Sequence, residues 1–127
     1  MQDSLLFEYA VIRVVPRVER EEFLNVGVVL YCRKLNYLKA IYTLNEGRLQ
    51  TFCSAIDIPQ LKEYLHAFDQ ISAGAPDSGP IGKLDAASRF RWLTATRSTI
   101  LQTSKVHSGL SVNPEETLQK LHAQLVL

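Results

Sequence analysis

A set of polar side chains gathers around the connection between the first two predicted strands. Arg13 lies among the apolar residues of one strand, while Glu22 and Asn25 lead into the next, just before Gly27. A guanidinium that is covered by protein needs a carboxylate or a bound anion, because an unpaired buried charge is very costly. One expected structure is a salt bridge between Arg13 and Glu22 that fastens the hairpin. The other is a polar pocket floored by Arg13, Asn25 and Gly27.

A second polar set lies in the segment RFRWLTATRSTILQTSKVHSG. Arg91 and Arg97 flank Trp92, and Ser98 and His107 follow. Arginines beside hydroxyl groups can hold a phosphate or carboxylate through two parallel hydrogen bonds, and an arginine beside an aromatic ring also suits a stacked base. The alternative is a solvated arginine-rich face next to a core tryptophan. Both readings stay open on the sequence.

The sequence offers no recognisable set of catalytic or metal-binding residues. His66, His107 and His122 are far apart and lack the spacing of metal ligands. No nucleophile elbow or dinucleotide-binding fingerprint is present, and the glycine-rich segment before Lys83 does not match a phosphate-binding loop. We expect no metal and no cofactor, and we assign no catalytic residue.

Composition narrows the class of protein. The chain has 127 residues and a net charge of +1 from 14 basic and 13 acidic residues, so bulk charge gives no reason to expect nucleic acid or a membrane as partner. The start MQDSLLFEY lacks a basic segment followed by a long apolar core, so we do not expect a secretory signal. Cys32 and Cys53 are then expected to be free thiols in a cytoplasmic protein.

Hydrophobic periodicity predicts an α+β fold. Alternating and β-branched residues indicate an N-terminal meander of three antiparallel strands and one later strand. Three or four helices should cover this sheet, and the whole of 1–127 should form one domain with a flexible loop at 72–83. Residues 86–95 fit a helix or a strand. The expected strands are 7–15, 24–32, 37–44 and 99–103, and the expected helices cover 49–56, 57–71 and 113–125.

The first hairpin should have one wholly apolar face. If the two strands pair with Val15 facing Asn25, Arg13 lies opposite Gly27. The missing side chain of Gly27 would then leave space above the sheet for the Arg13 guanidinium or for a bound group. The apolar face would collect the residues Ala10, Ile12, Val14, Leu24, Val26, Val28 and Leu30.

Two segments resemble a known bacterial family. YAVIRVVPRVEREEFLNVGVVL and RFRWLTATRSTILQTSKVHSGL are similar to the domain-of-unknown-function family number three thousand and thirty-seven, and the similarity covers most of the chain. The family has no established activity to transfer. Members of this family are often encoded beside a HipA-like kinase, so the resemblance implies a regulatory role and a protein partner of that kind.

Two functions therefore stay open. The small size, the near-neutral charge and the lack of a catalytic set favour a non-catalytic binding or regulatory module that acts with a protein partner, such as a HipA-like kinase. The alternative is a small enzyme or a sensor for a phosphorylated or nucleotide-like ligand. In that case Arg13 and one of Arg91 or Arg97 should share one anion-binding pocket, with Asn25 on its rim.

Overall fold

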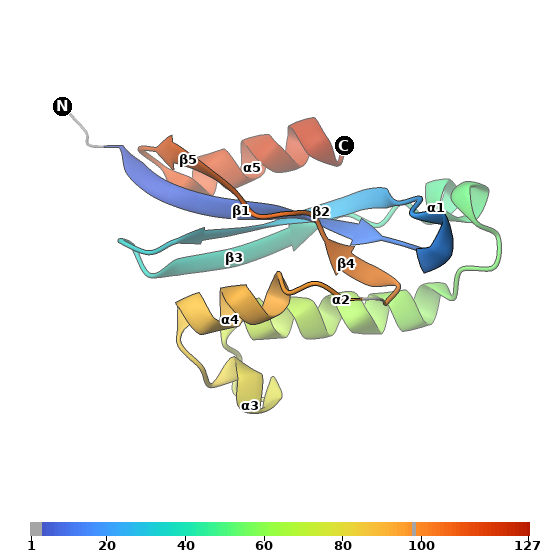
Figure 1. Ribbon diagram of the computed structural model, residues 1–127, viewed down its shortest axis with the longest axis horizontal. Coiled ribbons are helices and arrows are strands. Elements are labelled where there is room, and N and C mark those ends of the chain that lie inside the picture. The colour runs from blue at the N-terminus through green and yellow to red at the C-terminus, as the bar shows by residue number, and fades with distance from the viewer. Residues whose placement is uncertain (1–3, 98) are drawn as a thin grey trace.

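The computed structural model describes residues 4–97 and 99–127, which build a five-stranded antiparallel sheet with helices on both faces (Figure 1). The first three strands form the predicted meander, and the last two pair with the free edge of the first. The predicted α+β class is confirmed. The strands are β1 (Leu5–Val14), β2 (Leu24–Cys32), β3 (Tyr37–Tyr42), β4 (Leu101–Thr103) and β5 (His107–Ser111).

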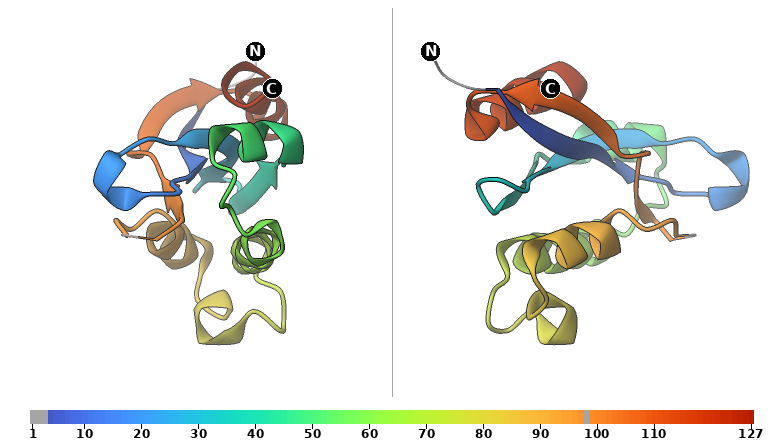
Figure 2. Two further views of the ribbon diagram at one scale, coloured as in Figure 1. Left: turned by 90° about the vertical axis from the view of Figure 1, so that its right-hand side faces the viewer. Right: turned by 60° about the vertical axis from the view of Figure 1, so that its left-hand side comes forward.

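The helices divide between the two faces of the sheet. Figures 1 and 2 show α2 and α4 beneath one face, with α3 beyond them, and α5 across the other face. The described residues contain no helix that is long and apolar enough to cross a membrane. The helices are α1 (Glu46–Phe52), α2 (Ile58–Ala73), α3 (Gly79–Gly82), α4 (Ala86–Leu93) and α5 (Pro114–Leu125), with a 3₁₀ turn, η1 (Val18–Arg20), between β1 and β2.

Side-chain caps fix where these helices begin. In α5 the Asn113 side chain accepts a hydrogen bond from the Glu116 amide at 3.1 Å. Glu116 does not complete a capping box, because the Asn113 amide donates to the Ser111 hydroxyl instead, at 3.0 Å. Glu115 accepts hydrogen bonds from Tyr37 and Lys39 of β3, so the start of α5 is tied to the sheet.

The structure revises several predicted boundaries in the second half of the chain. The expected loop at 72–83 contains the end of α2 and the short helix α3. Residues 86–95, which fitted either element, contain α4. The strand expected at 99–103 is shorter, and β5 was missed because its sequence HSGLS has little β-branched character.

A register shift in the first hairpin separates its apolar residues onto two faces. β1 and β2 pair with an irregularity between Ile12 and Arg13, so that Ile12 faces Gly27 and Arg13 faces Asn25. The predicted pairing of Arg13 with Gly27 is therefore wrong. The wholly apolar face is also wrong, because Ala10, Ile12 and Val14 pack toward α2 and α4 whereas Val28 and Leu30 pack toward α5.

Gly27 allows β2 and β3 to approach each other closely. This differs from the prediction that Gly27 leaves space for Arg13. A Cβ atom there would lie 2.5 Å from the Ile41 carbonyl oxygen, 2.8 Å from the Tyr42 Cβ and 3.1 Å from the Ile12 Cδ1. These neighbours belong to β3 and to the α2 side of β1, whereas Arg13 lies on the opposite face. The missing side chain therefore leaves no space for Arg13.

The two short strands on the second edge of β1 are joined by a buried serine. Ser104 is 6% exposed and follows β4 directly. Its amide donates to the Val11 carbonyl at 2.8 Å, and its hydroxyl accepts from the Val11 amide, also at 2.8 Å. A side-chain hydroxyl thus completes the hydrogen bonding of β1 where the chain passes from β4 to β5.

We expect Gly27→Ala to lower the free energy of unfolding by about 1–3 kcal/mol, because the added methyl group meets a backbone carbonyl that cannot move freely. Gly47→Ala is the matched control, since a Cβ there meets only the Asn45 Oδ1 atom at 3.6 Å on an exposed helix. That change should be neutral or stabilising by up to about 1 kcal/mol. Urea denaturation of both variants provides the test, and wild-type stability for Gly27→Ala would contradict the crowding argument.

A buried histidine links α5 to the chain that follows β3. His122 is 9% exposed and lies 3.1 Å from the Thr43 hydroxyl through its Nε2 atom. Burial lowers the pKa of His122 below its ordinary value of 6.5. The unfolded chain therefore takes up this proton at a higher pH than the folded chain does.

The stability that neutral His122 contributes should be complete above about pH 6.5 and lost as the pH falls through the lower pKa of the folded state. We expect the free energy of unfolding to fall between pH 7 and pH 5, and to fall less in His122→Gln, whose amide can still bond to Thr43. Urea denaturation at both pH values measures this difference. An equal fall in wild type and variant would show that His122 does not carry the effect.

Candidate functional site: an apolar groove between α2, α4 and β4

An open apolar groove lies on the α2 side of the sheet. One wall comes from α2, where Tyr64, Phe68 and Ile71 recur at helical spacing. The other wall comes from Trp92 of α4 and from the chain that leads into β4. The hollow has a volume of about 470 Å³. Its lining residues are Tyr64, Ala67, Phe68, Ile71, Trp92, Arg97, Thr99, Ile100 and Leu101.

Two aromatic side chains of this groove remain open to solvent. Tyr64 is 42% exposed and Trp92 is 40% exposed, although both are large. Phe68 and Ile71 lie deeper, at 6% and 8%. The groove therefore has a buried apolar floor and aromatic edges that a further apolar group could cover.

Arg97 is the charged residue among those that line the groove. Its guanidinium carbon lies 4.1 Å above the centroid of the Trp92 ring, and an amino group donates to the Trp92 carbonyl. Burial lowers the pKa of Arg97. Among residues 4–97 and 99–127 no carboxylate lies within ion-pair distance of it. The groove thus presents a partly desolvated cation on an aromatic face.

The structure brings only two of the predicted binding residues together. Arg13 and Asn25 are cross-strand neighbours on the α5 face of the sheet. Arg91 lies on the opposite face and pairs with Glu8 at 2.9 Å. Arg97 lies in the groove described above, so the expected single pocket for Arg13 with Arg91 or Arg97 does not form.

The remaining predicted residues lie elsewhere. The predicted salt bridge between Arg13 and Glu22 is absent, because the Glu22 carboxylate pairs with Arg20 at 2.5 Å. His107 is exposed in β5, and its ring packs against Tyr9 with centroids 5.3 Å apart. Ser98 lies outside the described residues.

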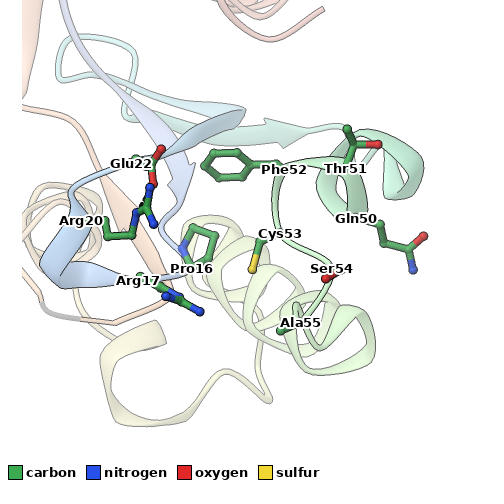
Figure 3. A pocket seen from close by; sticks show the side chains of 10 residues that line it. All are labelled: Pro16, Arg17, Arg20, Glu22, Gln50, Thr51, Phe52, Cys53, Ser54 and Ala55. Carbon is green, nitrogen blue, oxygen red and sulfur yellow. Dashed lines mark ion pairs between the residues drawn. The ribbon is translucent and has the colours of Figure 1, made fainter.

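A second hollow was missed by sequence reasoning. It has a volume of about 440 Å³ and lies between η1 and the end of α1 (Figure 3). Figure 3 shows Arg17 and Arg20 on one side and Cys53 on the other. Both cysteines are free, as predicted. The lining side chains are mostly exposed and polar, and Arg20 is paired with Glu22.

No group of three or more potential ligands that could hold a metal ion occurs among the described histidine, cysteine and acidic residues. Arg89, which the sequence placed beside Arg91 and Trp92, serves the fold. Its guanidinium donates to the carbonyls of Ile71 at 3.1 Å and Ser72 at 2.7 Å, at the end of α2, and to the Leu84 carbonyl at 3.0 Å. It therefore caps the last turn of α2.

The family model described as Protein of unknown function (DUF3037) matches residues 9–126. The chain belongs to the DUF3037 family. Searches of curated proteins and of solved structures gave no match. The region matched to DUF3037 contains the whole groove and also Arg13 and Asn25. The family match therefore does not indicate which of these two locations is the functional site.

The two neighbouring arginines of α4 should differ sharply in their effect on stability. Arg89→Met leaves two carbonyls at the end of α2 without their charged donor, and we expect a loss of about 1.5–3 kcal/mol. Arg91→Met removes only an exposed ion pair with Glu8, which is worth less than about 1 kcal/mol. Thermal and urea denaturation compare them. Equal losses would mean that Arg89 does not act as the cap.

Proposed function

We propose that this DUF3037 domain is a non-catalytic binding module that holds a short segment of a protein partner in the groove between α2, α4 and β4. The supporting observation is the groove itself, where Tyr64 and Trp92 stay open to solvent beside a cation that pairs with no carboxylate in the part of the chain that the structure describes. Trp, Tyr and Arg are the residue types that contribute most to protein–protein affinity.

The charge of the groove defines the chemistry of its occupant. An acidic side chain would pair with Arg97, which is already partly desolvated and held against the Trp92 ring. An apolar side chain one or two turns away would cover Phe68 and Ile71 on the groove floor. We therefore propose a partner segment that combines a large apolar anchor with an aspartate or glutamate.

A HipA-like kinase in the cytoplasm is the partner that we propose to test first, because of the gene association that the family resemblance carries. The competing hypothesis of a small enzyme or sensor places Arg13 and one of Arg91 or Arg97 in one pocket, with His107 as the proton carrier of an enzyme. Arg91 is paired with Glu8, and His107 packs on Tyr9 in a different strand. The separation of these groups favours the binding module.

Selection of displayed random peptides on the wild-type protein tests the proposal without knowledge of the partner. We expect enriched sequences that join an aromatic or leucine residue to an acidic one. Their affinity, measured by calorimetry, should fall about tenfold or more in Trp92→Ala and in Arg97→Glu. The HipA-like kinase, produced together with the domain, should lose its binding in the same variants.

The matched control is Leu110→Lys, which places a charge at an apolar residue of β5 that is 69% exposed and lies outside the groove. It should leave the affinity of the selected peptides unchanged. Peptides that bind Trp92→Ala and Arg97→Glu as well as wild type would refute the groove as the docking site. An equal loss in Leu110→Lys would point to a different face.

A further inference from the structure

The α5 face of the sheet carries a row of polar side chains beyond the end of α5. Asn25 of β2, Arg13 of β1 and Gln102 of β4 occupy paired positions on three neighbouring strands, so they share this face. All three are half-buried. The row is distinct from the groove, which lies on the α2 side of the sheet.

Arg13 is covered without being satisfied. Its guanidinium carbon lies 3.9 Å from the centroid of the Phe23 ring. Its Nε atom is buried and makes no hydrogen bond within the described chain, and none of the described carboxylates forms an ion pair with it. Burial lowers the pKa of Arg13. A partly buried guanidinium in this setting is stabilised when an anion binds to its accessible N–H groups.

Asn25, which pairs with Arg13 across the two strands, has a buried hydrogen-bond acceptor. Its Nδ2 atom donates to the Leu125 carbonyl at 3.1 Å, which fixes the orientation of the amide. Its Oδ1 atom is then a buried acceptor that receives no hydrogen bond from residues 4–97 or 99–127. Buried polar atoms in folded proteins are nearly always paired. Because Arg13 and Asn25 occupy paired positions on neighbouring strands, one small group that both accepts and donates hydrogen bonds can serve both side chains.

We propose that Arg13 and Asn25 bind a phosphate group that carries one proton. Its anionic oxygens accept from the Arg13 guanidinium, and its P–OH group donates to the Asn25 Oδ1 atom. Asn25 also borders a hollow of about 260 Å³ between β2, α1 and the end of α5, and Arg13 lies outside the lining of that hollow. Phe23 is 44% exposed, and its ring must swing away from the guanidinium to admit the ligand.

Inorganic phosphate and sulfate separate this proposal from simple charge attraction. Near pH 7.5 sulfate is a dianion and phosphate is mostly a dianion, and the two ions share a tetrahedral shape, but only phosphate keeps an O–H donor. We expect saturable binding of phosphate to the wild-type protein, followed by ³¹P NMR at constant ionic strength. Sulfate should compete about tenfold more weakly or worse, since it leaves the Asn25 acceptor unpaired.

Variants then assign the two contacts. Arg13→Gln should abolish phosphate binding, and Asn25→Ala should bind phosphate and sulfate with equal affinity. Arg17→Gln is the control, because it removes an exposed arginine from the same hairpin outside the row. Absence of saturable binding by the wild type, equal competition by sulfate, or loss of binding in Arg17→Gln would each overturn the proposal. None of these results depends on the peptide-binding groove.

Discussion

The hydrogen bonding of β1 along both of its edges is the constraint on which the rest of the structure depends. β2 pairs with one edge over most of the length of β1, while β4 and β5 share the other. Because β5 lies next to α5 in sequence, this second edge also brings α5 onto its face of the sheet. β4 likewise follows α4 in sequence. The pairing of β4 with β1 therefore positions both Leu101 in the groove wall and α4, which carries Trp92.

The two faces of β1 serve different purposes because of a local irregularity. Between Ile12 and Arg13 the pairing with β2 shifts, which keeps Gly27 over the apolar side and turns Arg13 and Asn25 together toward the other side. One extra residue in β2 thus places a polar pair next to the end of α5 while Ile12 and Val14 stay in the core. The groove and the polar pair are separated by the thickness of one sheet.

Much of the fold could be predicted from local patterns. The meander follows from alternating β-branched residues, and the helix starts at Asp57 and Asn113 follow from their capping side chains. The register shift between Ile12 and Arg13 could not be predicted from the sequence. Both possible registers bury apolar residues once α5 covers the second face of the sheet, so burial does not distinguish them. Arg97 and Arg13 were recognised as candidates, and their aromatic partners Trp92 and Phe23 lie close to them in sequence. The groove itself could not be predicted, because its second wall comes from α2, a separate segment of the chain. The partner of Arg91 is likewise 83 residues away, which no spacing rule reveals.

The order of pairing around β1 has a consequence for how the chain folds. Its partners on the second edge, β4 and β5, lie about a hundred residues further along the chain, as Val11 and Ser104 illustrate with a separation of 93. Such distant contacts close late, because a long loop must be ordered before they form. Until residues near 111 have left the ribosome, the edge of β1 exposes apolar residues and unpaired amides. The nascent meander is therefore the stage at which this protein is most exposed to aggregation.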